Sequence, residues 1–143
     1  MRIIVDTNIA FSAILNSQSL IGELIFNSEG SFEFFSPQFL KIEIDKYRPK
    51  LLKATSMKKK QLEASIQLVY KRIDFLSDKV ISPASWHKAY DLVKRIDEKD
   101  TPFLATTIEL DGILWTGDKK LIEGLRKKKF DKILSTRELY ETR

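Results

Sequence analysis

The sequence has no cysteine and only one histidine, His87, among its 143 residues. A disulfide framework and a thiol nucleophile are therefore excluded, as is a zinc site built from cysteines or from several histidines. No Gly-x-Ser-x-Gly elbow, no Gly-x-x-x-x-Gly-Lys phosphate loop and no Gly-x-Gly-x-x-Gly fingerprint occurs among the five glycines. These absences remove the usual signatures of serine hydrolases, P-loop enzymes and dinucleotide-binding proteins.

Long hydrophobic runs are also missing. The longest uncharged run, from Thr7 to Gly22, is too short and too rich in Asn, Ser and Thr to span a bilayer. Asp6 falls where a signal peptide would need its apolar core. With 31% charged and 10% aromatic residues, the chain is typical of a folded protein, and we expect one cytoplasmic domain over residues 1–143 with no membrane association.

Basic residues exceed acidic ones, 25 against 20, for a net charge of +5. Two clusters hold much of this charge: Lys46, Arg48, Lys50, Lys53, Lys58, Lys59 and Lys60; then Arg126, Lys127, Lys128, Lys129 and Lys132. Each alone could be a solvated helix face, but together they favour a nucleic-acid backbone as partner. The residues that we expect to contact nucleic acid are Lys119, Lys120, Lys127, Lys128 and Lys129.

Short apolar runs alternate with segments of helical periodicity. We predict strands at Arg2–Val5, Phe32–Phe35, Val80–Ile81, Ile113–Thr116 and Lys132–Leu134. We predict helices around Leu20–Ile25, from Pro37 to about Tyr47, from about Met57 to Phe75, then at Trp86–Lys94, Thr101–Glu109 and Lys119–Leu125. Strands separated by helices form crossover connections, so the pattern indicates an α/β fold with a mainly parallel sheet.

Acidic residues follow two of these strands. Asp6 comes directly after the first strand, and Asp118 follows the Ile113–Thr116 strand after one glycine. Because parallel strands end at the same edge of a sheet, both carboxylates should lie at the carboxyl edge, where open α/β sheets bind ligands. Asp100, just before Thr101-Pro102, should lie at a helix N-terminus. Each residue alone could instead be a helix cap or a turn residue.

Glu43 occupies an unusual place in its predicted helix, for which Ser36 would be the N-cap and Pro37 the first residue. An apolar stripe at helical spacing is formed by Leu40, Ile44, Tyr47 and Leu51. Glu43 lies within that stripe, whereas Asp45 and Lys46 fall on the opposite side. A glutamate on a packing face is costly unless it is paired. It could form a salt bridge, reach water at the rim, or share a metal ion with the aspartates, which is the interpretation we prefer.

Grouped carboxylates repel one another, so their pKa values rise unless a cation neutralises them. Hard oxygen ligands select Mg²⁺ or Mn²⁺. Such an ion favours attack of water on a phosphodiester, and the basic clusters would hold the rest of the nucleic acid. His87 lies in a predicted helix away from the acidic segments, and we expect a structural role for it.

Four segments of the chain resemble the motifs of PIN-domain nucleases. They are MRIIVDTNIAFS at residues 1–12, the helix around Glu43-Ile44, Asp97-x-x-Asp100-x-x-Phe-Leu-Ala, and TGDKKL at residues 116–121. The likeness covers nearly the whole chain in the same order. It is greatest for the small bacterial and archaeal members that serve as toxins of toxin–antitoxin pairs. Pro102, close after Asp100, departs from the small or polar residue that is usual there.

This resemblance implies a three-layer α/β/α sandwich and a ribonuclease that depends on Mg²⁺ or Mn²⁺. Carried over by motif, the acidic quartet that holds the metal ion and performs catalysis is Asp6, Glu43, Asp100 and Asp118. Asn8 and Thr116 would support these ligands by hydrogen bonds, and Asp97 could reach the metal through water. The family also implies three partners: an RNA substrate, an antitoxin whose tail occupies the active site, and a second copy in a homodimer.

Two other functions remain open from the residues. A PIN-like module could bind RNA without cutting it, but such a protein should have lost acidic ligands, and all four are present. An aspartate-based phosphatase would use Asp6 as nucleophile and needs a second aspartate two residues on, where this chain has Asn8. Converging carboxylates favour the nuclease.

Overall fold

A five-stranded sheet, parallel throughout, organises the chain in the computed structural model, which describes residues 1–143. The strand order is β3-β2-β1-β4-β5, with Ile3 of the central strand opposite Phe34 on one side and Ile113 on the other. The strands are β1 (Arg2–Val5), β2 (Glu33–Pro37), β3 (Ile73–Leu76), β4 (Ile113–Trp115) and β5 (Ile133–Leu134). Because every connection is a crossover, the carboxyl ends of all five strands share one edge.

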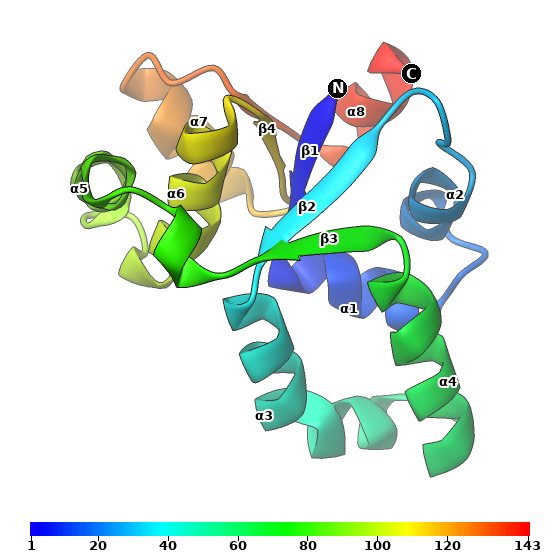
Figure 1. Ribbon diagram of the computed structural model, residues 1–143. Helices are drawn as coiled ribbons and strands as arrows, with labels where there is room; N and C mark the ends of the chain where they lie inside the picture. The colour runs from blue at the N-terminus through cyan, green and yellow to red at the C-terminus, as the bar shows by residue number, and fades with distance from the viewer.

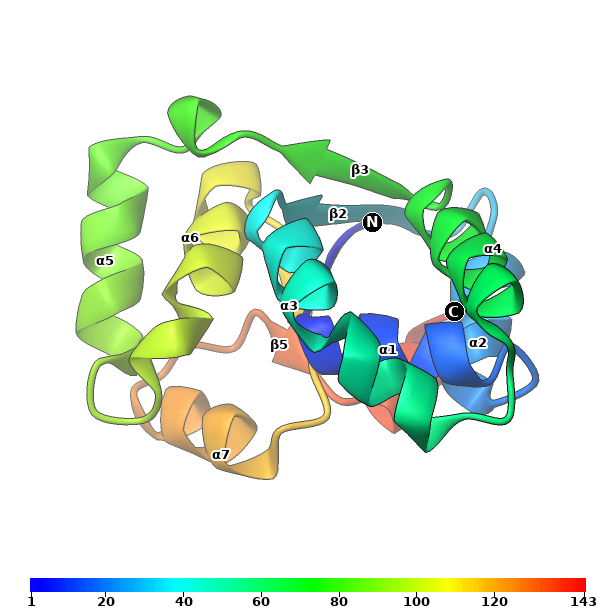
Figure 2. The same ribbon diagram turned by 90° about the horizontal axis from the view of Figure 1, so that it is seen from below.

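Eight α-helices surround the sheet: α1 (Thr7–Leu15), α2 (Leu20–Phe26), α3 (Phe39–Ala54), α4 (Lys59–Tyr70), α5 (Pro83–Val93), α6 (Thr101–Leu110), α7 (Lys119–Lys127) and α8 (Thr136–Thr142). Helix α6 packs on β1, β2 and β4, and α5 packs on α6. Helices α1, α2, α4 and α8 lie on the other face, as Figures 1 and 2 show. The predicted three-layer α/β/α sandwich is therefore confirmed.

The core is built on strands covered from both sides. Ile3, Ile4 and Val5 are fully buried, as expected for a central parallel strand that reads as a continuous apolar run. Trp115 of β4 is also fully buried, and its indole Nε1 donates a hydrogen bond to Thr136 Oγ1 at 3.0 Å. The one polar atom of this large side chain is thus satisfied, and β4 is tied to the start of α8.

The third strand differs from the prediction. Val80 ends a short 3₁₀ helix, Asp78–Val80, and is no part of the sheet. The edge strand is instead β3, which occupies the end of the segment predicted as a helix to Phe75. The helical spacing of Leu62, Ile66 and Val69 stops with α4 at Tyr70, and the short apolar run that follows pairs with β2. Periodicity alone does not separate such a run from a helix end.

The predicted cap at Ser36-Pro37 is wrong, because both residues belong to β2. The Ser36 hydroxyl donates a hydrogen bond to Val5 O at 2.8 Å, so it is engaged by the sheet and does not cap a helix. Pro37 is the last residue of the strand, and it lies opposite Leu76 of β3. Helix α3 begins two residues later, at Phe39, without a side-chain cap.

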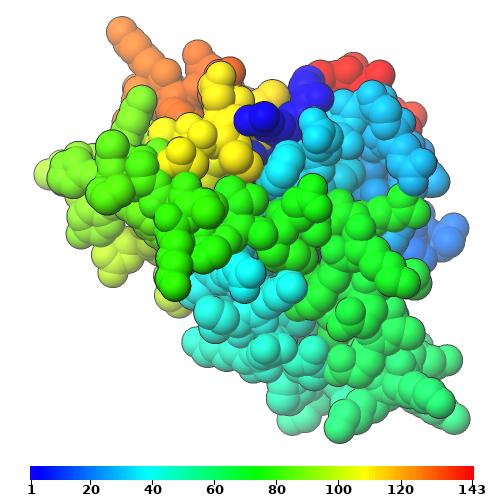
Figure 3. Space-filling view, viewed as in Figure 1, coloured from blue at the N-terminus to red at the C-terminus, as the bar shows by residue number.

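Helix α3 continues past Tyr47, where we expected it to end, and contains Pro49. Proline removes a backbone hydrogen bond and crowds the preceding turn, which bends a helix. Figure 1 shows α3 changing direction along its length. In the space-filling view of Figure 3, side chains of α3 and α4 meet below the sheet, and Arg48 of α3 pairs there with Glu63 of α4.

None of the eight helices has both the length and the hydrophobicity of a membrane span; α1 and α2 reach them only when taken together, and they are bent by 97° relative to each other.

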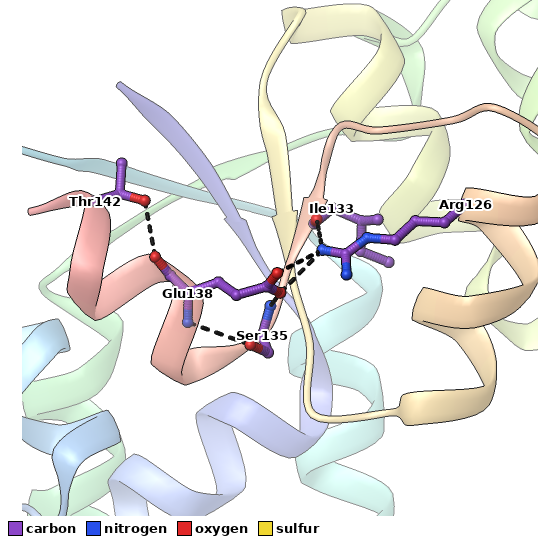
Figure 4. Close-up of polar contacts among 5 residues, drawn as sticks. All are labelled: Arg126, Ile133, Ser135, Glu138 and Thr142. Atoms are coloured by element: carbon purple, nitrogen blue, oxygen red, sulfur yellow. Dashed lines mark hydrogen bonds and ion pairs between the residues drawn. The ribbon is translucent and has the colours of Figure 1, made fainter.

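An ion pair and several hydrogen bonds join the C-terminal elements (Figure 4). Arg126 Nη2 donates to both carboxylate oxygens of Glu138, at 2.9 and 3.0 Å, and to Ile133 O at 3.1 Å. Glu138 also accepts the backbone N–H of Ser135, whose hydroxyl accepts the N–H of Glu138 in return. This capping box begins α8 and, through Arg126, fastens it to the last turn of α7.

We expect Ser135→Ala to lower the free energy of unfolding by about 1 kcal/mol, the usual cost of a lost cap. Glu138→Gln retains a side chain that can complete the capping box but loses the ion pair, which is half exposed, so it should cost only about 0.5 kcal/mol. Urea unfolding of the two variants measures both values. If Ser135→Ala leaves stability unchanged, the capping box does not hold α8.

Candidate active site

Two carboxylates flank the point where the strand order of the sheet reverses. Asp6 follows β1, which continues to α1, and Asp118 follows the adjacent strand β4 and begins α7. The chain leaves these two strands on opposite sides, and such a switch point is where open parallel sheets bind ligands. The predicted position of both residues at the carboxyl edge is confirmed.

Asp6 is buried, with 6% of its surface exposed. Its Oδ1 accepts the Ile9 N–H at 2.9 Å and caps α1, a helix not expected from the sequence. Burial is the main cause that raises the pKa of Asp6 to about 6. Hydrogen bonds from Thr116 and Ile9 oppose this rise, while the charges of Asp118 and Glu43 add to it.

Asp118 caps its helix in the same way, since its Oδ1 accepts the Leu121 N–H at 3.2 Å. Its own backbone N–H donates to Thr116 Oγ1 at 3.1 Å. Thr116 is fully buried and is hydrogen-bonded to both aspartates, so it links them. Capping is thus a real role of Asp6 and Asp118, but it engages only one oxygen of each carboxylate.

Asp100 differs from the other two, because it occupies the N-cap position of α6 without making a side-chain cap hydrogen bond. Its Oδ2 is buried and has no hydrogen-bond partner. The pKa of Asp100 is raised to about 7, first by burial and then by the charges of Asp97, Asp6, Asp118 and Glu43. A buried carboxylate oxygen that supports no local structure is costly, which indicates that it is kept for a ligand.

Glu43 points into the same region from α3. The predicted helical phase is correct: Leu40, Ile44 and Leu51 are buried, and Asp45 is exposed and pairs with Arg48. The Thr7 hydroxyl donates a hydrogen bond to Glu43 Oε1. Thr7 was not singled out from the sequence, although it lies inside the Asp-Thr-Asn segment. Its role depends on a contact between α1 and α3 that no local pattern contains.

A single cleft of about 540 Å³ brings these residues together. All four carboxylates of the quartet line it, and so do Asn8 and Asp97. Asn8 is exposed and makes no hydrogen bond, while Asp97 accepts the Lys99 N–H at 3.0 Å. Apart from Thr7, the rest of the lining is apolar or basic: Phe11, Leu15, Tyr47, Leu51, Ala54 and Phe103, with Lys50 and Lys99. The cleft thus has an acidic end and an apolar arm.

The five lysines predicted to contact nucleic acid do not line the cleft. Lys119 and Lys120 follow Asp118 at the exposed start of α7. Lys127, Lys128 and Lys129 lie at the far end of this nine-residue helix, about 13 Å along its axis, and Lys128 Nζ donates to Leu92 O. From the first basic cluster, Lys50 does reach the cleft, and Lys99 does so from outside either cluster. His87 is exposed and takes no part in the cleft.

The donor chemistry of the acidic end fits a hard divalent cation. All its candidate ligands are carboxylate oxygens, and Asp100 Oδ2 is buried without a partner. The side chains are not gathered into a closed site, because no group of three or more acidic or histidine side chains is arranged to hold an ion. Mutual repulsion of the carboxylates favours such an open arrangement.

The fold and the site therefore define an α/β protein with an acidic cleft at the switch point of a parallel sheet. A family model described as PIN domain matches residues 4–138. The chain belongs to the PIN-domain family, whose members are typically nucleases and generally use divalent metal ions.

Two solved structures have the same fold at low sequence identity. VapBC2 from Rickettsia felis, bound to a DNA fragment from its promoter, has a chain with a TM-score of 0.67 and 14% identity, covering 94% of this chain and 97% of that chain. VapBC-1 from nontypeable Haemophilus influenzae has a chain with a TM-score of 0.66 and 17% identity; the match covers 96% of this chain and 99% of that chain. A search of curated proteins found no match.

The raised pKa of Asp6 predicts how stability varies with pH. The folded protein binds this proton more tightly than the unfolded chain, so the contribution is full below about pH 4 and is lost as pH rises through about 6. In the absence of divalent ions, Asp6→Asn should therefore be more stable than the wild type at pH 8, by up to about 3 kcal/mol, and should not be so at pH 4. Asparagine retains an oxygen to cap α1.

Urea unfolding at the two pH values measures this difference. Asp131→Asn, a change at an exposed carboxylate, is the matched control and should follow the wild type at both. A wild type that is more stable than Asp6→Asn at pH 8 would show that the Asp6 carboxylate is held for the structure alone.

Proposed function

We propose that this protein is a metal-dependent nuclease that hydrolyses phosphodiester bonds of RNA. The observation that carries the proposal is the meeting of Asp6, Glu43, Asp100 and Asp118 in one cleft, with a buried oxygen of Asp100 unpartnered. Four carboxylates at a switch point have a high electrostatic cost, and a bound cation offsets that cost. Membership of the PIN-domain family supports the same function.

These four carboxylates would hold Mg²⁺ or Mn²⁺, which lowers the pKa of bound water and stabilises charge on the leaving oxygen. The chain's own groups orient the ligands. Thr116 and the Ile9 N–H fix Asp6, and Thr7 fixes Glu43. Asp97 lines the same cleft at its rim and can reach a metal-bound water. Asn8 is free to bond to the substrate or to a ligand.

The choice of RNA as substrate rests on the family resemblance and on charge. Lys50 of α3 and Lys99, which is next to Asp100 in the chain, both line the cleft and can neutralise phosphates near the bond that is cut. Lys119, Lys120, Lys127, Lys128 and Lys129 follow along α7, where a longer strand would pass over them. The protein's net charge of +5 suits this polyanionic partner.

We further propose that the chain is the toxin of a toxin–antitoxin pair in the cytoplasm, where an antitoxin blocks the cleft and a second copy forms a homodimer. The two similar structures are both named as VapBC proteins, and the likeness extends over nearly the whole of both chains. Co-purification with the product of an adjacent small gene tests this role.

A binding module without activity is the second candidate, favoured only by the open arrangement of the carboxylates. The phosphatase candidate is weaker, because Asn8 stands where its second aspartate is needed and makes no hydrogen bond in the cleft. A module that only bound RNA would have no use for the buried, unpartnered oxygen of Asp100.

Digestion of total RNA with and without Mg²⁺ tests the activity directly. Glu43→Gln retains the shape of the side chain and removes its charge, so it should lower the cleavage rate by about 100-fold or more while the fold is retained. Asp45→Asn, on the exposed side of the same helix, should cleave like the wild type. An equal loss in both variants, or cleavage that persists in EDTA, contradicts the proposed site.

Salt dependence separates the lysines of the cleft from those of α7. Changing both Lys50 and Lys99 to Gln should weaken binding of a short RNA and reduce the salt slope by roughly 0.7 for each phosphate that is no longer neutralised. Changing Lys127, Lys128 and Lys129 to Gln should reduce the slope only for a longer RNA that reaches them. If the triple change alters the salt slope for neither the short nor the longer RNA, those lysines are solvated surface.

A further inference from the structure

The apolar arm of the cleft has a regular construction. On α3, Glu43 is followed one turn later by Tyr47 and then by Lys50; on α1, Thr7 is followed one turn later by Phe11. Both walls thus present a polar group at the sheet edge and an aromatic ring about 6 Å further along the helix. The rings face each other edge to face, with centroids 6.0 Å apart and planes at 82°.

These rings are only partly buried, and the Tyr47 hydroxyl makes no hydrogen bond. Lys46 Nζ lies 5.3 Å from the centroid of the Tyr47 ring, and Lys50 is the next residue along the cleft wall. Lys46 does not line the cleft, so Lys50 is the cation that shares the cleft wall with the ring. Proteins hold single-stranded nucleic acid with aromatic rings that stack on bases and cations that meet the backbone, and α3 supplies one of each to the cleft.

We propose that Phe11 and Tyr47 form a subsite for one unpaired nucleobase, next to the phosphate held at the acidic end. A base attached through its sugar to that phosphate reaches the rings, because they lie one helical turn away. A paired base is stacked inside its helix and does not enter such an arm without leaving the stack. The subsite therefore selects single strands and loops over duplexes. This proposal rests on the proposed function for the kind of ligand.

The bend of α3 contributes to the subsite. Pro49 lies between Tyr47 and the second half of the helix, from which Lys50, Leu51 and Ala54 line the cleft opposite Leu15 of α1. The view along the carboxyl edge in Figure 2 shows this second half of α3 beside α1. Beyond the two rings the cleft is lined by the apolar side chains of Leu15, Leu51 and Ala54, which suit the apolar face of a base.

Binding without metal tests the subsite independently of cleavage. The probes are a labelled ten-nucleotide oligoadenylate, the same backbone without bases, and the oligoadenylate paired with its complement, in EDTA at low salt. Repulsion between phosphates and carboxylates is common to the first two probes and cancels in the ratio of their Kd values. Fluorescence anisotropy should show that the wild type prefers the base-bearing single strand by about 5- to 150-fold, the range for stacking of one base.

Tyr47→Ala and Tyr47→Leu should bring this ratio close to one, whereas Tyr47→Phe should retain it. Tyr90→Ala on α5, at a tyrosine that is 44% exposed and outside the cleft, is the matched control and should keep the wild-type ratio. Tyr47→Leu preserves apolar volume, so it gives the answer even if Tyr47→Ala does not fold.

Any one of four results would overturn the subsite. They are a wild-type ratio near one, no measurable binding of the oligoadenylate, equal binding of the duplex, and an unchanged ratio in Tyr47→Leu. The first result is also the one expected if the arm receives a peptide. Mg²⁺-dependent cleavage that Glu43→Gln abolishes, together with a ratio near one, would remove the subsite and leave the nuclease. A ratio above 5 without cleavage would retain the subsite and contradict the nuclease.

Discussion

The buried carboxylate of Asp6 is the constraint on which the arrangement depends. It lies between the central strand and α1, beside the strand that leads to Asp118. Burial alone would favour its neutral form, and the nearby charges of Asp118 and Glu43 favour that form further. Two hydrogen bonds only partly offset this cost. A buried carboxylate of this kind lowers the stability of the fold, and groups with such perturbed pKa values cluster at functional sites.

The remaining parts of the site follow from the sheet. Helices α1, α6 and α7 all begin at its carboxyl edge, so the residues at their N-termini meet there. Asp6 and Asp118 serve as caps, which fixes their orientation, and Asp100 does not, which leaves its oxygens free. Helix α3 supplies Glu43 from across the cleft. The ion pair of Arg126 and Glu138 holds the other end of α7.

Much of this could be predicted from the sequence, because it depends on local patterns. The strands that precede Asp6 and Asp118 are short apolar runs, and the phase of Glu43 can be counted along its helix. Three of the errors and omissions have a common cause in long-range contacts. Ser36 bonds to Val5 across the sheet, β3 becomes a strand by pairing with β2, and Thr7 meets Glu43 between two helices. The aromatic pair of Phe11 and Tyr47 joins the same two helices, and no spacing rule connects its members.

Thermal melting at pH 8 shows whether the carboxylates of the cleft hold a divalent cation. We expect millimolar Mg²⁺ or Mn²⁺ to raise the Tm of the wild type above its value in EDTA, because the ion binds the folded state. The same addition should raise the Tm of Asp100→Asn much less. If neither ion shifts the wild type, the carboxylates do not form a metal site, and the nuclease interpretation is contradicted.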